Sequence, residues 1–287
     1  MRPSLILTGD WHIREDQPVC RIDNYWETQK DKLLWLSDLQ KQYNCPIIHS
    51  GDLLNHWKAS PFLLSFMLQY LPADINIVYG NHDLPQHSLQ QIDKSGMRTL
   101  ELAGRIKIMK ECHWGTMPSK GSLYLSKGER KVLVWHTMTY TGNTPWPGCT
   151  DLSAREMLEK YPEFDLIVTG HNHKPFIEEL DGRILVNPGS LFRQSAAETH
   201  TPGVVLYYAE ENRVERVEYT YSKNAISREH IKGKKNTESR YEAFIKQLKQ
   251  EGDFELSFKK NLERYFAQNK VSKAVQDIIY QKMEEEI

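Results

Sequence analysis

Short apolar runs that end in glycine, histidine or acidic residues constrain the fold of this chain more than any other feature. The runs read LILTGDWH, PIIHSGDLL, INIVYGNHD, VLVWH and LIVTGHNH. Brief apolar, β-branched runs are typical of buried strands, and longer polar stretches with helical spacing separate most of them here. This alternation predicts an α/β fold with a buried sheet.

Two of the stretches between the runs have features typical of helices. The stretch from about Asn24 to Tyr43 places apolar residues roughly on one face, namely Trp26, Leu33, Leu34, Leu36 and Leu39. A second helix is predicted from Pro61 to Tyr70, with Ser60 as its N-cap. Further along, GVVLYY and RVERVEYTY predict a hairpin that completes a sheet.

Length and composition favour one large domain with an appendage. The chain has 287 residues, of which 39% are hydrophobic, so it can bury a full core. We expect a catalytic domain over residues 1–222 and a helical C-terminal extension over 223–287, which docks on that domain or contacts a partner or DNA. No apolar run is long enough to span a membrane, so we expect a cytoplasmic protein.

Cysteine usage and charge exclude some classes of site. The four cysteines have no CxxC spacing, which indicates neither a thiolate zinc site nor a disulfide framework. The formal net charge is −1, so the chain has no overall basic field for nucleic acid. Any binding of nucleic acid would depend on local patches or on metal ions.

Polar side chains that can bind metals follow each apolar run. In open α/β folds, ligands gather at the carboxyl ends of the strands, and we expect seven side chains to meet there: Asp10, His12, Asp52, Asn81, His136, His171 and His173. A mixed set of carboxylate, amide and imidazole groups suits Mn²⁺, iron or Zn²⁺ better than Ca²⁺ or Mg²⁺. Seven ligands exceed the needs of one ion, and a shared carboxylate can bridge two. We therefore expect two divalent ions, with Mn²⁺ favoured and iron, Zn²⁺ or Mg²⁺ as alternatives.

The motifs DxH, GD, GNHD, a lone His and GHxH occur in this order between Leu5 and about Arg193. Together they resemble the calcineurin-like metallophosphoesterases. The resemblance implies a four-layer α-β-β-α sandwich with two mixed sheets, to which the helical C-terminal tail is added. It also implies that Asp52 bridges two ions, the first also held by Asp10, His12 and His173, and the second by Asn81, His136 and His171.

The predicted chemistry is hydrolysis of a phosphate ester by a water molecule that two divalent ions activate. By the resemblance, His82 is a catalytic residue that stabilises the transition state or protonates the leaving oxygen, and Asp83 orients its ring. Neither side chain is expected to be needed as a ligand.

The finer motifs look most like the SbcD-type DNA repair exonucleases. GDWH, GDLL, GNHDLP and GHNH are followed by NPGSLFRQ, in which Arg193 could clamp a phosphate or form an ordinary ion pair. The family nucleases often have a histidine where this chain has Asn55. His56, one residue later, is a second candidate for binding substrate if the loop is shifted, and otherwise has a capping or surface role. SbcD-type proteins usually carry an α/β capping domain after the catalytic domain, whereas a helical tail is expected here. Either the tail replaces the cap, or the chain belongs to a shorter, phage-type lineage with a different substrate preference.

This resemblance implies a DNA substrate and a coiled-coil ATPase partner of the SbcC type, with no membrane partner. A homodimer is also compatible with the sequence. Two other functions stay open: a phosphodiesterase for cyclic or dinucleotide substrates, which would have a closed pocket, and a DNA-binding subunit of an ATPase-nuclease complex.

Overall fold

Strands and helices alternate along most of the chain in the computed structural model, which describes residues 2–110, 112–118, 125–127, 130–220 and 225–229, and short pieces between 262 and 277. The chain divides into two units, residues 1–228 and 229–287. In the first unit the order is β1 (Leu5–Thr8), α1 (Tyr25–Tyr43), β2 (Ile47–His49), α2 (Pro61–Tyr70), β3 (Ile75–Ile77), η1 (Pro85–His87), η2 (Leu89–Lys94), α3 (Gly96–Leu102), β4 (Ile106–Ile108), β5 (Leu125–Lys127), β6 (Arg130–Trp135), α4 (Ala154–Lys160), β7 (Leu166–Thr169), β8 (Phe176–Leu180), β9 (Arg183–Asn187), β10 (Gly203–Tyr208) and β11 (Arg213–Glu218).

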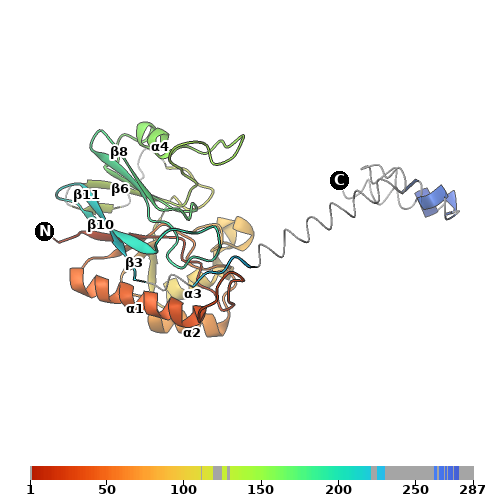
Figure 1. Ribbon diagram of the computed structural model, residues 1–287, viewed down its shortest axis with the longest axis horizontal. Helices are drawn as coiled ribbons and strands as arrows, with labels where there is room; N and C mark the ends of the chain where they lie inside the picture. The colour runs from red at the N-terminus through yellow and green to blue at the C-terminus, as the bar shows by residue number, and fades with distance from the viewer. Residues whose placement is uncertain are drawn as a thin grey trace. The chain divides into compact units, whose positions relative to one another are not determined.

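The strands form two mixed sheets. One sheet has the order β11-β10-β1-β2-β3-β4, and the other has the order β5-β6-β7-β9-β8. Strands β1 to β4 are parallel, whereas β10 pairs antiparallel with β1. Helices α1, α2 and α3 lie on one side of the sheets and α4 lies on the other, as Figure 1 shows. These are the four layers that the motifs predicted.

Three hydrophobic clusters fill the spaces between the layers, and the alternation of side chains along each strand decides which cluster a residue joins. On β1, Ile6 packs toward α1–α3, whereas Leu5 and Leu7 pack between the two sheets. On β7, Val168 packs between the sheets and Ile167 packs toward α4. Strands β1 and β7 are thus buried on both faces, which explains why their sequences are continuously apolar.

Local sequence signals set the ends of the helices. The side chain of Asn24 accepts a hydrogen bond from the amide of Glu27 at the start of α1, and Asn44 ends this helix in a left-handed conformation. Ser60 accepts from the amide of Leu63 at the start of α2. Both predicted helices and the predicted β10–β11 hairpin are therefore confirmed.

The structure adds elements that were not predicted. Strands β8 and β9 form an antiparallel hairpin at the edge of the second sheet, and α4 begins with a capping box between Ser153 and Glu156. In the second unit, the described positions include helical residues between 262 and 277. The predicted extension from residue 223 stays a prediction, because most of its residues lie outside the described ones. None of the helices in the described part of the chain combines the length and apolar character needed to cross a bilayer.

The packing between the sheets predicts a large cost for truncating Ile48, which is fully buried there. We expect Ile48→Ala to lower the free energy of unfolding by about 2–5 kcal/mol, because the change removes buried methyl groups and leaves a cavity. Urea titration followed by circular dichroism measures the shift. Leu102→Ala is the control, because Leu102 is 72% exposed at the end of α3. Equal decreases in the free energy of unfolding for the two variants would contradict the layered core.

Candidate metal centre

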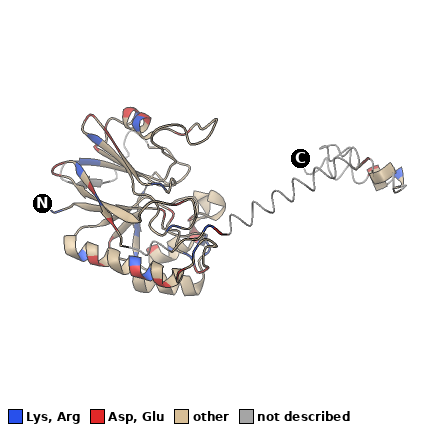
Figure 2. Cartoon of the chain, viewed as in Figure 1, with Lys and Arg blue, Asp and Glu red and all other residues tan. Residues whose placement is uncertain are grey.

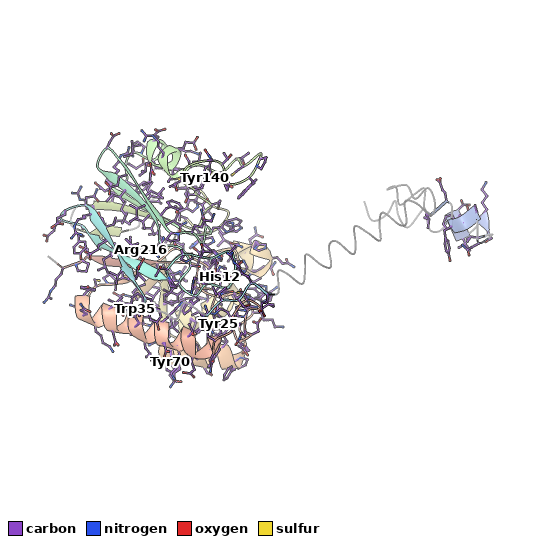
Figure 3. The ribbon with its side chains drawn as sticks, in the orientation of Figure 1. His12, Tyr25, Trp35, Tyr70, Tyr140 and Arg216 are labelled. Atoms are coloured by element: carbon purple, nitrogen blue, oxygen red, sulfur yellow. The ribbon has the colours of Figure 1, made fainter. Side chains whose placement is uncertain are left out.

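The loops that follow β1, β2, β3, β6 and β7 bring together all seven side chains that the sequence indicated as metal ligands. Three groups of side-chain ligand atoms each lie within 4.8 Å of one another: Asp10, His12 and His173; His12, Asp52 and His82; Asp52, His136 and His171. The first sheet contributes the residues from Asp10 to Asn81, and the second contributes the residues from His136 onward. Figure 3 shows His12 among the loops beyond the strand ends.

Around Asp10, nitrogen and oxygen atoms face one another at short range. The Nε2 atoms of His12 and His173 are 3.0 Å apart, and Nε2 of His12 is 3.5 Å from Oδ2 of Asp52. Oδ1 of Asp10 accepts a hydrogen bond from the amide of His171, whereas Oδ2 is buried and has no hydrogen-bond partner. A buried carboxylate oxygen without a donor is costly unless a cation lies near it.

The second group meets at the amide oxygen of Asn81. Oδ1 of Asn81 is 3.1 Å from Nε2 of His136 and 3.0 Å from Nδ1 of His171. Nε2 of His136 is also 3.4 Å from Oδ2 of Asp52. Asp52 thus lies between the two groups, as expected for a bridging carboxylate.

The backbone at this site is held in unfavourable conformations. Four candidate ligands that are not glycine have a positive φ angle: Asp10 (49°), His12 (48°), Asp52 (56°) and His171 (72°). Such conformations are uncommon outside glycine and cluster at functional sites, where the surrounding structure maintains them. A Cβ on Gly80 would lie 2.1 Å from Oδ1 of Asp52, so glycine is required there for the close approach of the two loops.

Hydrogen bonds from Nδ1 fix the orientation of two of the imidazoles. Nδ1 of His136 donates to the carbonyl of Ser50 at 2.7 Å, which turns Nε2 toward Asp52 and Asn81. Nδ1 of His173 donates to the carboxylate of Glu198, which turns Nε2 toward His12. Carboxylate and carbonyl partners of this kind are typical of metal-bound histidines. Glu198 was missed in the sequence, where it lies 25 residues beyond His173 and outside every motif.

The pKa values of the four imidazoles separate into two groups. Burial lowers the pKa of His12 to about 3 and that of His171 to about 4, so both are neutral near pH 7. For His136 burial acts in the same direction, but Asp52 outweighs it and raises the pKa to about 9. For His173 burial is likewise outweighed, by Glu198 and Asp10, and the pKa rises to about 9.

These observations fit a pair of divalent cations. A raised pKa shows that the oxygens around His136 and His173 favour positive charge, which a metal ion would supply in place of the protons. Asp10, with its unpartnered Oδ2, and Asp52 would provide carboxylate ligands, and Asn81 a neutral oxygen. The assignment of individual ligands to each ion stays a prediction.

His82 and Asp83 take different positions beside the cluster. His82 is exposed, its Nδ1 donates to the carbonyl of Asn55 at 2.8 Å, and its ring centroid lies 4.6 Å from that of His12. Asp83 is fully buried and accepts hydrogen bonds from the amides of Asp52, Leu53, Leu54 and Gly80. The expectation that Asp83 orients the His82 ring is therefore wrong, because these amides occupy its oxygens. Asp83 instead ties the two ligand-bearing loops together.

The two candidate substrate-binding residues lie apart from these contacts. Arg193 is buried, donates to the carbonyl of His200 and lines a separate cavity of about 230 Å³ with Arg21 and Lys32. His56 is exposed, and its described contacts are local ones with Lys58 and Trp57. The structure does not bring either side chain into the metal-ligand groups, so their roles in binding substrate stay predictions.

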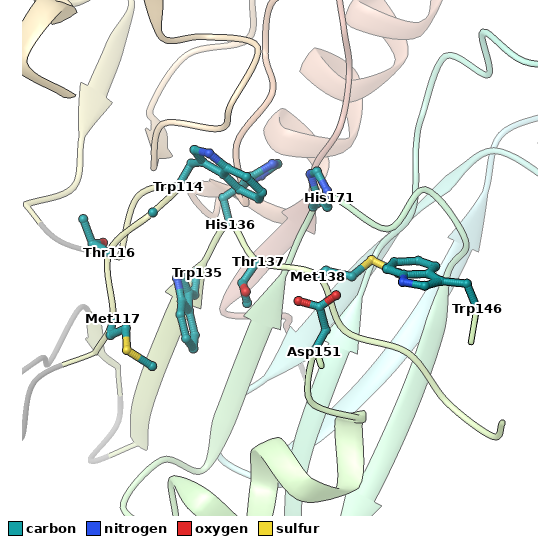
Figure 4. A pocket seen from close by; sticks show the side chains of 11 residues that line it. Trp114, Thr116, Met117, Trp135, His136, Thr137, Met138, Trp146, Asp151 and His171 are labelled. Carbon is teal, nitrogen blue, oxygen red and sulfur yellow. The ribbon is translucent and has the colours of Figure 1, made fainter. Parts of the chain in front are cut away.

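A cavity of about 370 Å³ borders the cluster on the side of His136 and His171. Figure 4 shows the side chains that line it, with Trp114 beside the two histidines and with Trp146 and Asp151 on other walls. The Trp114 ring lies 4.7 Å from the His171 ring, centroid to centroid, and 5.9 Å from that of His136. Trp114 was not singled out in the sequence, because it follows no strand motif.

The raised pKa values predict that metal binding releases protons. His136 and His173 carry protons near pH 7 in the metal-free chain, and a metal ion that binds Nε2 displaces them. We expect Mn²⁺ affinity to rise between pH 7 and 9, by roughly tenfold per pH unit for each proton released. Calorimetry in buffers with different ionisation enthalpies counts the protons. An affinity that stays constant over this range would contradict the prediction.

The contact between Glu198 and His173 predicts weaker metal binding in Glu198→Gln. An amide is a poorer acceptor for Nδ1–H, and losing such a partner typically lowers metal affinity about 10- to 100-fold. Equilibrium dialysis against Mn²⁺ measures the change. Glu218→Gln, at an exposed position on β11, should bind Mn²⁺ like the wild type. Equal affinities in the two variants would show that Glu198 has no part in the centre.

Comparison with known proteins identifies relatives of this chain. A probable metallophosphoesterase of Methanocaldococcus jannaschii is 29% identical over 121 residues, which make up 42% of this chain and 59% of the relative. Among solved structures, a novel archaeal phosphodiesterase has a TM-score of 0.44 at 16% identity and covers 75% of this chain and 99% of its own. Vps29 of Entamoeba histolytica, complexed with zinc, has a TM-score of 0.40 at 16% identity with the same coverage.

A family model also matches the greater part of this chain. Residues 4–212 match the model of the calcineurin-like phosphoesterase superfamily domain, a range that includes every candidate metal ligand. The chain belongs to the calcineurin-like phosphoesterase superfamily.

Proposed function

We propose that this protein hydrolyses phosphodiester bonds with two divalent metal ions, and that its substrate is DNA. The convergence of two carboxylates, one amide and four imidazoles from both sheets carries the proposal. When bound, two ions at this site would activate a water molecule and neutralise charge on the phosphoryl oxygens. Membership of the phosphoesterase superfamily supports this chemistry.

The proposed role of His82 is to protonate the leaving oxygen. The hydrogen bond from Nδ1 to the carbonyl of Asn55 leaves Nε2 as the atom that can exchange a proton with substrate. The ring is exposed and adjacent to His12, so a phosphate at the metal centre could reach it. Asp83 acts indirectly, through the loop that carries His82 and Asn81.

The motifs around this site support a nuclease of the SbcD type. GDWH, GDLL, GNHDLP and GHNH followed by NPGS are the residues that favour this branch. Acidic and basic residues are interspersed along the described ribbon in Figure 2, so contact with DNA would depend on the metal ions more than on a broad basic face. A coiled-coil ATPase partner, a homodimer and a cytoplasmic location belong to the same proposal and stay predictions.

A second candidate function is a phosphodiesterase for small nucleotides. The cavity beside His136 and His171 favours it, because about 370 Å³ lies in the usual range for sites that bind small molecules. A polymer substrate would need an open path through which the chain can continue. The two functions differ in the length of substrate that is cleaved.

The test is incubation of the purified protein with Mn²⁺ and end-labelled single- and double-stranded DNA, beside a dinucleotide. We expect the labelled DNA to be shortened, with Asp52→Ala inert as the control. Cleavage of the dinucleotide alone would favour the second candidate. Cleavage by Asp52→Ala at the wild-type rate would contradict both.

His82→Asn separates catalysis from metal binding. The amide keeps a polar side chain of similar reach but cannot transfer a proton, so we expect turnover to fall about 10²- to 10⁴-fold with Mn²⁺ binding unchanged. Rates come from the DNA assay and metal content from equilibrium dialysis. Full activity in this variant, or loss of its metal, would overturn the assignment.

A further inference from the structure

The cavity beside the metal centre has a composition that the hydrolytic chemistry does not require. Its walls include Trp114, Trp146 and Asp151, and it is bordered by the ligand candidates His136 and His171. Figure 4 shows these side chains on elements from different parts of the chain, gathered around one space. A group that enters this space is therefore adjacent to a phosphate held at the metal centre.

The aromatic walls suit a flat ring system. Trp114 packs against His171 with an angle of 32° between the ring planes, and its amide donates to the carbonyl of Tyr79. Trp146 remains 47% exposed in the loop between β6 and α4. A large aromatic face left uncovered beside a cavity is a surface on which a planar ligand can stack.

Polar groups at the same cavity suit the edge of a nucleobase. Asp151 is a half-buried hydrogen-bond acceptor, and the hydroxyl of Thr137 can donate or accept. Small-molecule sites generally combine apolar walls with a few such groups, which fix the orientation of the ligand. Exocyclic amines and ring N–H groups of nucleobases are donors that match the Asp151 carboxylate.

We propose that this cavity is a nucleoside subsite, in which a base stacks on Trp146 and donates a hydrogen bond to Asp151. The inference rests on the proposed function, because it needs the 5′-phosphate or scissile phosphate of the nucleotide to lie at the metal centre. The inference also specifies the substrate class: the nucleotide next to the cleaved bond is unpaired, as in a single-stranded end or a small nucleotide. A base within a duplex is stacked and paired and cannot enter the cavity.

The experiment is calorimetric titration of the full chain, loaded with Mn²⁺, with AMP and with ribose 5-phosphate. The two ligands share the sugar and the phosphate and differ by the base. We expect AMP to bind about tenfold or more tightly than ribose 5-phosphate, since stacking on one aromatic ring changes affinity by roughly ten- to a hundredfold. In Trp146→Ala the advantage of AMP should disappear, with the affinity for ribose 5-phosphate unchanged.

Phe62→Ala is the matched control, because Phe62 is a 60% exposed aromatic residue on α2 outside the cavity. This variant should bind AMP more tightly than ribose 5-phosphate by the same factor as the wild type. Equal binding of AMP and ribose 5-phosphate by the wild type, the absence of binding by either, or an advantage that survives in Trp146→Ala would overturn the inference. If the wild type binds AMP as expected but cleaves no phosphodiester, the subsite stands and the proposed function is refuted.

Discussion

Leu5, Ile48 and Val168 pack between the two sheets, and this contact sets where the carboxyl ends of the strands meet. The site depends on it, because the first sheet carries Asp52 and the second carries His136. Neither sheet alone holds a complete set of ligands. A shift of one sheet along the other would separate Asp52 from His136.

Within the site, Asp83 and Glu198 maintain an arrangement that would otherwise be unfavourable. The buried carboxylates and imidazoles have little solvent to screen them, and several ligand atoms face one another at close to 3 Å. Asp83 holds the two loops from the first sheet through four backbone amides, and Glu198 fixes His173. The positive φ angles at the ligands are a further cost of this arrangement. The rest of the fold must offset these costs.

The sequence pattern predicted the α/β class and the convergence of the seven candidate ligands, and the family resemblance predicted the four layers. Each candidate ligand lies in the first few residues after a strand, so its position is determined by local sequence and by the sheet. β8 was missed because its sequence FIEEL forms a half-exposed edge strand rather than an apolar run. α4 is a seven-residue helix whose signal, the capping box at Ser153, is short.

The remaining residues of the site could not be predicted because tertiary contacts alone define them. Glu198 and Trp114 lie in loops whose course no periodicity specifies, and they meet the histidines only when the chain is folded. The partner of Asp83 was predicted wrongly, since proximity to His82 in sequence says little about which donors reach a buried carboxylate. Arg193 follows NPGS, as the motif indicated, but its described hydrogen bond is to the backbone of the neighbouring loop.

The most direct test of the central claim is the number of metal ions bound per chain, measured by equilibrium dialysis and elemental analysis in the wild type and in Asp52→Asn. The two half-sites share the Asp52 carboxylate, so the account predicts two Mn²⁺ ions per wild-type chain and one or none in the variant. Two ions in both proteins would contradict the bridging role of Asp52. A wild type that binds no metal would contradict the centre itself.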